Sequence, residues 1–348
     1  MASRINQATL PRAYRVVKKS FSAYKLWNIL KTQISRILSN LSDKTLVWGL
    51  PPVIMVEAAA ICNLHCPCCA CGAGQVHRKQ PYLDESLFQN LVDELKDSLW
   101  MILFWNQGEP FLNPRLMDMI RYASDRRIYT MTSTNGHFLN KPDEIINSRL
   151  DELIISLDGA SEETYLKYRI GGDFFKVIKG VESLIEKRQK KNLSNPRVTI
   201  QCVISRQNEH EIESLENLAR KIGADELVFK TMEITPGVDS ADYLPQNQKF
   251  RRYSVHPDQW TRKNDQKHCP ELWNQPVINS DGSFSVCCFD KTAVFNPGMY
   301  QQGHFTDLWK GTEWMKIRER VKNNKASMLP CKYCTASLNL NYRSVVFR

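Results

Sequence analysis

Between residues 53 and 230, short apolar runs alternate with helical stretches, and this alternation constrains the fold more than any other feature. The apolar runs are typical of β-strands: Val53–Val56, Trp100–Trp105, Tyr129–Ser133, Leu153–Leu157, Val198–Val203 and Leu227–Lys230. Helical patterns lie between them, near residues 84–97, 114–125, 140–148, 161–187 and 208–222. Strands that alternate with helices predict a parallel sheet, so we expect an α/β fold with a partial (β/α)6 TIM-like barrel. In such barrels, ligands bind at the carboxyl ends of the strands.

Positive charge is concentrated at the N-terminus. The chain of 348 residues has a net charge of +10, and residues 1–45 carry nine basic side chains against one acidic side chain. The rest of the chain is therefore close to neutral, so we expect no nucleic-acid partner. The sequence shows neither an apolar run of membrane-spanning length nor a secretory signal. We therefore expect a cytoplasmic protein.

The first 50 residues form a basic segment of their own, which Pro51 and Pro52 end. Within residues 12–41, apolar side chains recur every three or four positions, which predicts an amphipathic helix. One interpretation is a helix packed on the body of the protein. The other is a helix that contacts a partner or an anionic membrane, which would place the protein at the inner membrane surface. A mitochondrial transit peptide is a third alternative.

The C-terminal part is predicted to be a smaller, cysteine-bearing unit. The stretch "PVINSDGSFSVCCFD" is typical of a hairpin that turns at Asp281–Gly282, and a helix is expected near residues 307–323. The polar stretch before it is interpreted as a linker. The expected domains are residues 1–50, 51–235, 236–265 and 266–348.

Five cysteines lie within residues 62–72, directly after the first predicted strand. Cys62, Cys66 and Cys69 have the spacing C-x3-C-x2-C. Three thiolates on a tight loop suit iron, and a [4Fe–4S] cluster needs four ligands. Three protein ligands therefore leave one iron open to a substrate or cofactor. The alternative is a structural zinc site.

This loop and four further motifs resemble the radical S-adenosylmethionine (radical SAM) superfamily. They are "CNLHCPCC", "NQGEP" (106–110), "STNG" (133–136), "SLDG" (156–159) and "YRIGGDFFKVIKGV" (168–181). The resemblance covers most of residues 53–232. It implies a radical SAM core in which S-adenosylmethionine binds the open iron and is cleaved reductively. The resulting radical then takes a hydrogen atom from the substrate.

The resemblance also assigns cofactor-binding residues. It places Gly108 and Glu109 near the methionyl amino group, Ser133 and Asn135 near the ribose, and Ser156 and Arg169 near the carboxylate. The sequence departs from the family at Cys68, where an aromatic or large apolar residue usually backs the adenine. Cys68 and Cys71 are also alternatives as cluster ligands.

A second set of cysteines lies in the C-terminal unit. Four protein thiolates fill the ligand positions of a [4Fe–4S] cluster and leave no open iron. The spacing resembles the twitch domain, the single-cluster form of the SPASM extension of radical SAM enzymes. A four-cysteine zinc site is the alternative, and Cys288 and Asp290 are substitute ligands. The set consists of Cys269, Cys287, Cys331 and Cys334.

These features favour an oxidoreductase that passes a substrate electron to the second cluster. The domain plan resembles aminocyclitol dehydrogenases of the 2-deoxy-scyllo-inosamine type. The expected substrate is a sugar, an aminocyclitol or a glycan or lipid precursor, and the reductant is a flavodoxin or ferredoxin. Alternatives are a maturase that modifies a ribosomal peptide and a non-catalytic metal-binding scaffold. Glu57, Gln201 and Lys230 lie at strand ends and are candidates to face the ligand, but the sequence singles out no catalytic base.

Overall fold

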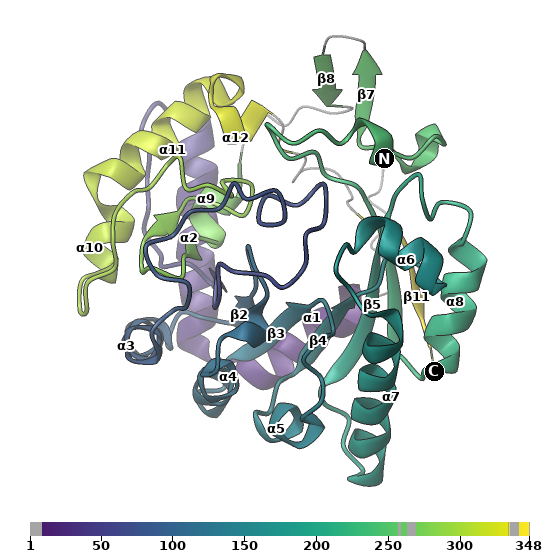
Figure 1. Cartoon of the computed structure of the whole chain (residues 1–348). Helices are drawn as coiled ribbons and strands as arrows, with labels where there is room; N and C mark the ends of the chain where they lie inside the picture. The colour runs from purple at the N-terminus through teal and green to yellow at the C-terminus, as the bar shows by residue number, and fades with distance from the viewer. Residues whose placement is uncertain (1–8, 257–258, 263–268, 333, 335–340, 348) are drawn as a thin grey trace.

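The computed structural model describes residues 9–256, 259–262, 269–332, 334 and 341–347. Within this part of the chain, one sheet of nine strands has the order β10-β9-β1-β2-β3-β4-β5-β6-β11. Strands β1 to β6 run parallel to one another, each beside its successor in the chain. They are Val53–Val56, Met101–Phe104, Tyr129–Thr134, Glu152–Ser156, Arg197–Ile204 and Glu226–Thr231. The sheet curls into an open, partial barrel, as predicted (Figure 1).

Helices cover the outer face of this barrel in the order that the sequence predicts (Figure 1). They are α3 (Glu85–Leu95), α4 (Leu116–Asp125), α5 (Pro142–Asn147), α6 (Glu162–Tyr168), α7 (Phe174–Lys190) and α8 (Ile212–Lys221). Polar caps fix where several of them begin. The side chains of Asp84, Ser161 and Asp173 accept hydrogen bonds from the free N–H groups of the first turns of α3, α6 and α7. Apolar strand and helix faces meet in one buried core.

The helical stretch predicted over residues 161–187 is two helices in the structure. The chain leaves helical geometry between Tyr168 and Phe174, and Gly171 takes a positive φ of 82° there. A glycine adopts this backbone conformation without the steric cost that a side chain would add. The break places Arg169 at the barrel mouth rather than on the outer surface of a helix.

Both edges of the sheet are extended by the C-terminal half of the chain. Strands β9 (Val277–Ile278) and β10 (Phe284–Ser285) form the predicted hairpin, and β9 pairs with β1. On the far edge, β11 (Asn341–Val346) runs antiparallel to β6. The sequence analysis did not identify β11. The pairing of β9 with β1 joins the C-terminal unit directly to the barrel.

The remaining C-terminal elements pack beside the edge of the sheet that β9 and β10 form. They are the helices α9 (Glu271–Asn274), α10 (Phe305–Lys310), α11 (Thr312–Asn324) and α12 (Leu329–Lys332). The segment predicted to be a linker contains a two-stranded hairpin of β7 (Tyr253–His256) and β8 (Gln259–Arg262). Short 3-10 turns lie at Pro110–Leu112, Ala241–Tyr243, Gln248–Phe250 and Lys325–Ser327.

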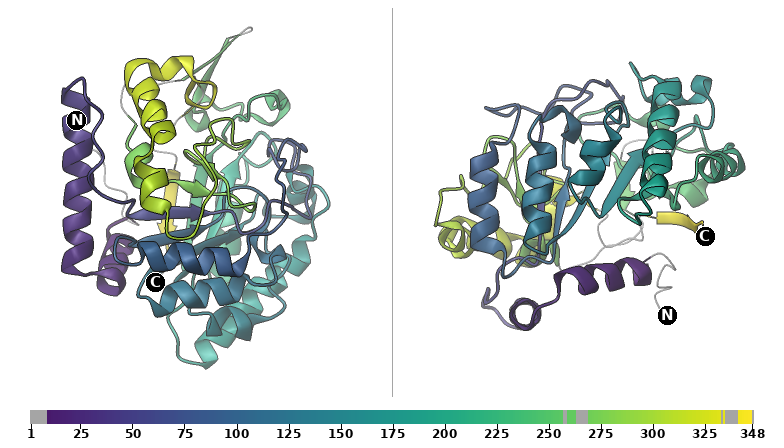
Figure 2. Two further views of the ribbon diagram at one scale, coloured as in Figure 1. Left: turned by 90° about the vertical axis from the view of Figure 1, so that its left-hand side faces the viewer. Right: turned by 90° about the horizontal axis from the view of Figure 1, so that it is seen from below.

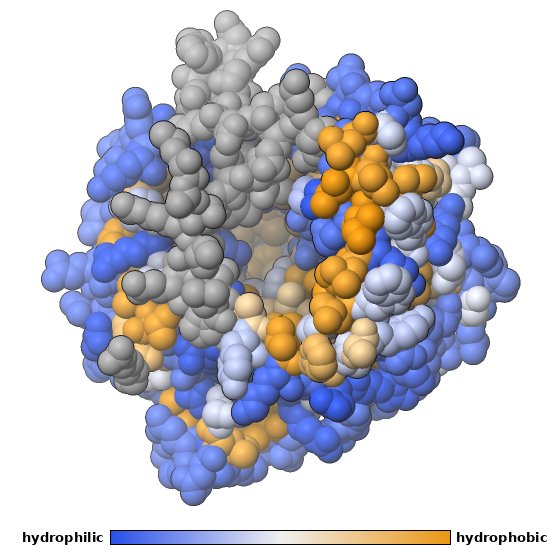
Figure 3. Space-filling view, turned by 180° about the vertical axis from the view of Figure 1, so that it is seen from behind, coloured by the Kyte–Doolittle hydropathy of each residue, from blue (hydrophilic) through white to orange (hydrophobic). Residues whose placement is uncertain are grey.

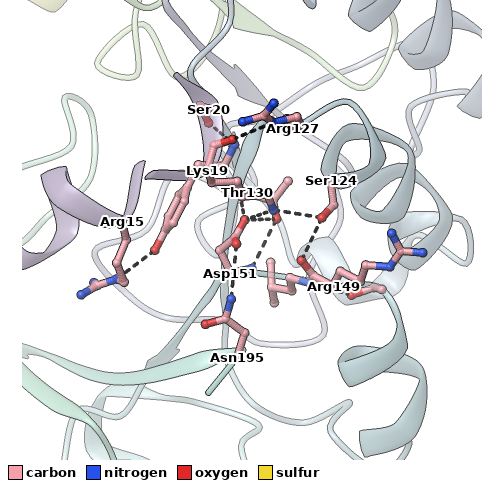
Figure 4. Close-up of polar contacts among 12 residues, drawn as sticks. Arg15, Lys19, Ser20, Ser124, Arg127, Thr130, Arg149, Asp151 and Asn195 are labelled. Atoms are coloured by element: carbon pink, nitrogen blue, oxygen red, sulfur yellow. Dashed lines mark hydrogen bonds and ion pairs between the residues drawn. The ribbon is translucent and has the colours of Figure 1, made fainter. Parts of the chain in front are cut away.

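The N-terminal segment forms two helices, α1 (Thr9–Ser20) and α2 (Ala23–Leu41), where the sequence analysis predicted one. The side chain of Ser22 caps α2, which allows the chain to turn between them. Helix α1 lies across the amino-terminal end of the barrel (Figure 2). There Lys19 Nζ contacts Asp151, and Ser20 Oγ bonds the Trp100 carbonyl at 2.8 Å (Figure 4).

In the described part of the chain, no helix combines the length and the apolar character needed to cross a membrane.

Candidate functional site

A cavity of about 340 Å³ opens at the carboxyl ends of the barrel strands. It brings together residues from the cysteine loop, from the carboxyl-terminal parts of five strands (β2 to β6) and from the break between α6 and α7. Its lining includes nine residues that the sequence analysis assigned to the cluster or the cofactor: Cys62, Cys66, Cys69, Gly108, Glu109, Ser133, Asn135, Ser156 and Arg169. The structure therefore places these nine residues around one space.

The cysteine loop reaches this cavity because two glycines allow close backbone contacts. A Cβ atom at Gly108 would lie 2.2 Å from the Ala59 carbonyl oxygen, and Gly108 has a φ of +71°. A Cβ atom at Gly72 would lie 2.5 Å from the Cys66 carbonyl oxygen. Both positions therefore require a residue without a side chain. The first contact seats the Gly-Glu-Pro segment against the beginning of the loop.

The three thiols of the spacing motif lie in a largely buried environment. Burial raises the pKa of Cys66 to about 11 and also raises the pKa of Cys62. Two polar groups approach these sulfurs: Asn135 Nδ2 lies 3.8 Å from Cys62 Sγ, and Arg169 Nη1 lies 3.8 Å from Cys66 Sγ. A thiolate that is buried needs positive charge nearby, and a bound metal cluster supplies it.

Glu109 is a buried carboxylate on the cavity whose hydrogen-bond donors are neutral. They are Thr134 Oγ1 at 2.7 Å, the Asn135 amide at 2.7 Å and the Phe111 amide at 3.1 Å. Burial raises the pKa of Glu109, and these hydrogen bonds act in the opposite direction. A buried carboxylate of this kind is suited to receive a cationic ligand group, such as an ammonium.

Arg169 is held over the cavity by Asp158. The Nε atom of Arg169 lies 2.6 Å from Asp158 Oδ2, and the other carboxylate oxygen accepts the Val203 amide at 2.7 Å. This ion pair is nearly buried, so the guanidinium is fixed in orientation. One edge of a guanidinium remains able to bind a ligand carboxylate through parallel hydrogen bonds. The sequence analysis quoted the motif that contains Asp158 but did not assign this residue a role.

Cys68 does not line this cavity. It lies in the buried apolar cluster that also contains Leu64, Cys66 and Tyr168, and these three residues do line the cavity. Cys71 lines the cavity as well. The pKa of Cys71 is raised by burial to about 12, and its thiol donates a hydrogen bond to the Ala60 carbonyl.

The three strand-end candidates separate into two groups. Gln201 and Lys230 line the cavity. Glu57 does not line it and instead forms a buried salt bridge in which Arg78 Nε lies 2.8 Å from Glu57 Oε1. The cavity also contains Asn106, which donates to Glu57 at 3.0 Å. Asn106 and Trp105 were missed by the sequence analysis, although both lie at the end of a predicted strand.

Lys230 has an unusual environment at the cavity wall. Burial lowers its pKa to about 8, with Arg252 acting in the same direction and Glu233 acting against it. Glu233 is itself paired with Lys291 at 2.7 Å. Because part of Lys230 is therefore uncharged near neutral pH, this amine can accept a proton from a bound ligand.

A second, small cavity lies in the C-terminal unit, and Cys269, Cys287, Cys331 and Cys334 all line it. Most of its remaining wall is apolar, including Val286 and Phe295, and the charged residues Glu271 and Lys325 also line it. Burial raises the pKa of Cys269 to about 11, and the neighbouring Cys334 adds to this shift. The structure thus gathers the four cysteines that the sequence analysis grouped.

The two substitute ligands proposed from the sequence lie elsewhere. Cys288 packs against the apolar cluster inside the barrel, with Met55 and Trp105. Asp290 accepts hydrogen bonds from the Val294 and Phe295 amides, so it orders its own loop.

In the described residues, no group of three His, Cys, Asp or Glu side chains has the geometry to hold a metal ion. The donor sets nevertheless fit iron–sulfur clusters in their chemistry. Three thiols share one cavity with a buried carboxylate and a fixed guanidinium, which matches a cofactor that carries both an amino group and a carboxylate. Four thiols line the second cavity, which matches a cluster without an open iron. The fold and these two sites define an iron–sulfur enzyme with one open cluster and one fully ligated cluster.

Models of protein families also indicate two iron–sulfur domains, and they identify the family of each domain. The model of the radical SAM superfamily matches residues 56–219, and the model of the SPASM iron–sulfur cluster-binding domain matches residues 269–335. The chain belongs to the radical SAM superfamily and carries a C-terminal SPASM domain. These two domains imply S-adenosylmethionine and two [4Fe–4S] clusters as cofactors.

Three curated relatives share part of this chain. AdoMet-dependent heme synthase of Methanosarcina barkeri is 28% identical over 178 residues, which are 50% of this chain and 48% of that protein. The tungsten-containing aldehyde ferredoxin oxidoreductase cofactor-modifying protein of Pyrococcus furiosus is 26% identical over 191 residues, which are 53% of this chain and 52% of that protein. PqqA peptide cyclase of Bradyrhizobium diazoefficiens is 25% identical over 182 residues, which are 52% of this chain and 46% of that protein. The chain thus spans about half the length of the curated relatives it matches.

Solved structures support the fold. The structure of Streptococcus suis SuiB bound to S-adenosylmethionine covers 94% of this chain and 82% of its own, with a TM-score of 0.62 and 13% identity. The structure of SuiB bound to its precursor peptide SuiA covers 91% of this chain and 73% of the SuiB chain, with a TM-score of 0.57 and 13% identity. BtrN in complex with AdoMet and 2-DOIA covers 82% of this chain and 93% of its own, with a TM-score of 0.49 and 18% identity.

Proposed function

We propose that this protein is a radical SAM oxidoreductase that removes two electrons from a small polar substrate. A sugar, an aminocyclitol or a glycan or lipid precursor is the substrate class. The observation that carries this proposal is the second cavity, where four cysteines share a small space with mostly apolar side chains and with Glu271 and Lys325. A cluster with four protein ligands transfers electrons without binding substrate. It is therefore suited to take the electron that an oxidation releases.

Bound in the first cavity, S-adenosylmethionine and its cluster supply the acceptor of a substrate hydrogen atom. The chain's own residues hold the cofactor: Cys62, Cys66 and Cys69 ligate the cluster. Glu109 receives the amino group and Arg169 the carboxylate, because each presents the complementary charge to the cavity. Ser133, Asn135 and Ser156 offer further polar contacts along the same wall.

Lys230 is proposed as the base. A substrate alcohol becomes a carbonyl when it loses one hydrogen atom, one proton and one electron. Lys230 would take the proton, while bound S-adenosylmethionine with its cluster would supply the acceptor of the hydrogen atom and the second cluster would supply the acceptor of the electron. Lys230 lines the same cavity as the cofactor residues, and burial lowers its pKa to about 8. It is therefore partly in the form that accepts a proton at physiological pH.

The second candidate function is modification of a ribosomal peptide. The fold of SuiB bound to its precursor peptide SuiA favours it, because the two chains align over most of their lengths. PqqA peptide cyclase, a partial relative, points in the same direction. In this case the peptide side chain that reacts would occupy the space beside Lys230.

We further propose a flavodoxin or a ferredoxin as the reductant and a cytoplasmic location, at the inner membrane surface. The basic helices over residues 12–41 support the membrane contact, which is argued in the next section.

Anaerobic turnover with deuterated substrates tests the proposal. We expect deuterium to pass from a substrate carbon into 5′-deoxyadenosine, and we expect a product three mass units lighter than the substrate deuterated at that carbon. Candidate cyclitols, sugars and their lipid-linked forms are compared with a short precursor peptide. Transfer from the peptide alone would replace the oxidoreductase proposal with the second candidate. Transfer without any oxidised product would contradict both the role of Lys230 and that of the second cluster.

A further inference from the structure

The two N-terminal helices pack on the body of the protein with their polar sides. In α2, the buried side chains are Lys25, Asn28, Thr32, Ser35 and Ser39. Asn28 Nδ2 donates to the Leu50 carbonyl at 2.8 Å, and its Oδ1 accepts the Leu50 amide at 2.9 Å. These bonds fix the rotation of α2 about its own axis. This rotation is opposite to the usual one, in which an amphipathic helix buries its apolar side.

Helix α1 is fixed in the same way. Arg12 contacts Glu152 and Glu226 at the amino-terminal ends of β4 and β6, and Lys19 contacts Asp151. Figure 4 shows the contact of Lys19 with Asp151, together with further contacts of Arg15 and Ser20 with the barrel. Part of the basic charge of the segment therefore neutralises acidic side chains at the closed end of the barrel.

The consequence is a continuous apolar stripe on the outside of both helices. We call it the outer stripe. Trp27 is 56% exposed, Tyr14 67% and Leu41 79%, whereas Asn28 is 3% exposed. Of the 23 large hydrophobic residues that are exposed in the described part of the chain, ten lie on these two helices and an eleventh, Phe21, lies in the turn between them, so the exposure is concentrated there. The outer stripe consists of Tyr14, Val17, Phe21, Tyr24, Leu26, Trp27, Leu30, Ile34, Ile37, Leu38 and Leu41.

The outer stripe lies on one face of the molecule. From behind, it runs as a hydrophobic band over α2 (Figure 3), and the two turned views place α1 and α2 on this same side (Figure 2). The cofactor cavity is lined by the carboxyl ends of the strands, whereas α1 contacts their amino-terminal ends. A surface that covers the stripe therefore leaves the cavity open to water.

Charge identifies the occupant of this face. From Thr9 to Leu41, the sequence carries seven basic residues and no acidic residue, and four of the seven, Arg12, Arg15, Lys19 and Lys25, contact the body of the protein. The other three remain on the outer side. Lys18 on α1 is exposed, and Lys31 and Arg36 on α2 are half-buried beside the stripe. Apolar residues that include Trp and Tyr, flanked by Lys and Arg, are the composition of helices that lie in the headgroup region of a bilayer. Exposed aspartates nearby, Asp43 and Asp97, reduce this positive potential only locally.

We propose that the outer stripe docks on the surface of an anionic lipid bilayer. The apolar side chains enter the headgroup region, and Lys18, Lys31 and Arg36 contact anionic lipid headgroups. This inference is independent of the proposed reaction, because it rests on the exposed face of α1 and α2 alone.

Vesicle flotation with the anaerobically purified full chain tests the proposal. We expect the protein to float with vesicles of phosphatidylcholine mixed with phosphatidylglycerol, and to float less with phosphatidylcholine alone. Raising the salt concentration should weaken the recovery, because it screens the charges. The affinity for S-adenosylmethionine is expected to be the same with and without vesicles.

Two variants and a matched control make the test specific. Trp27→Glu with Ile34→Glu should lower the fraction bound by roughly tenfold or more, because it puts charge into the part of the stripe that enters the headgroup region. Lys18→Glu with Lys31→Glu should weaken only the binding to anionic vesicles. The control is Phe175→Glu with Leu193→Glu on the body, since these side chains are 56% and 46% exposed, against 56% for Trp27 and 45% for Ile34. It should bind like the parent chain.

Three results would overturn the proposal. One is recovery that is no better with vesicles than without them. Another is flotation that both stripe variants leave unchanged while thermal unfolding shows that they are folded. The third is a lipid-independent dimer, detected by sedimentation, that Trp27→Glu with Ile34→Glu dissociates and that does not float; this would assign the face to a second copy of the chain.

Discussion

Glu109 illustrates how a single buried charge prepares a site for its ligand. Its carboxylate has three neutral donors, and burial raises its pKa, so a cationic ligand group would stabilise its charged form. We expect Glu109→Gln to weaken S-adenosylmethionine binding by about 10- to 100-fold, which corresponds to one charge-assisted hydrogen bond. Anaerobic calorimetry measures this affinity. The exposed Glu163→Gln serves as the control, and an unchanged affinity in Glu109→Gln would remove Glu109 from the cofactor site.

Lys230 gives a prediction about pH. Its pKa is lowered by burial to about 8, and the charges facing it are those of Arg252, Glu233, Arg12 and Cys288. If the neutral amine is the base, kcat should rise with pH through about 8 and level off above it. Lys230→Met should lower kcat by about 100-fold or more and abolish this rise, whereas Lys230→Arg keeps the charge but cannot act as a base at this pH.

The same pKa shift affects stability in a defined direction. The native state disfavours the charged form of Lys230, so the penalty is present below pH 8 and disappears as the pH rises from about 8 to 10.5. The unfolding free energy of Lys230→Met should therefore exceed that of the parent chain at pH 7 more than at pH 10. Denaturant titration at both pH values measures this difference, and an equal difference at both would contradict the assigned shift.

At this scale, the sequence predicted well which residues gather at the cavity and less well which ones point into it. Gly108, Ser133 and Arg169 lie where their motifs indicate. Glu57 also lies beside the motifs, but it pairs with Arg78 instead. Cys68 packs in the same apolar cluster as Cys66 and yet does not line the cavity. Position along a strand or loop indicates nearness to the site, whereas side-chain direction depends on partners that are distant in the sequence.

Among the elements, the cysteine loop depends on a buried link between domains. Arg78, at the end of the loop, bonds both carboxylate oxygens of Glu57 and also the Lys291 carbonyl at 2.9 Å in the C-terminal unit. Its side chain and that of Glu57 are 1% and 0% exposed. Arg78→Met leaves the Glu57 carboxylate buried without its cation, and such losses cost about 3–5 kcal/mol.

We therefore expect Arg78→Met to lower the unfolding free energy by about that amount and to loosen the loop, with fewer iron atoms retained. Denaturant unfolding and iron analysis measure the two effects. Arg115→Met, which removes exposed ion pairs with Glu85 and Asp118, is the matched control and should leave the unfolding free energy nearly unchanged. Equal losses in the two variants would contradict the role of Arg78 as an interdomain link.

The elements also show where periodicity is informative and where it fails. All six barrel strands agree with the predicted ones to within one or two residues, because buried parallel strands are continuous apolar runs. The break between α6 and α7 was missed, since the helical period continues across it and only the glycine pair marks it. The rotation of α2 could not be predicted either, because burial of the apolar side is the default expectation for an amphipathic helix.

For the whole molecule, the sequence predicted a barrel and a second cysteine-bearing unit, but not how the two are joined. The pairing of β9 with β1 and of β11 with β6 brings chain segments together that are more than a hundred residues apart. Short strands of two to six residues carry little pattern of their own. The closure of the barrel by α1 was missed for a related reason, since its partners Asp151 and Glu152 are also distant in sequence.

The account depends most on one claim: the barrel holds a cluster with an open iron, and the C-terminal unit holds a fully ligated one. Anaerobic iron analysis with electron paramagnetic resonance of the reduced protein tests it. The parent chain should bind about eight iron atoms, and S-adenosylmethionine should change part of the signal. Cys62→Ala with Cys66→Ala and Cys69→Ala should leave about four iron atoms and a signal that the cofactor no longer changes. Zinc in place of iron in either unit, or a cofactor effect that survives this triple substitution, would contradict the account.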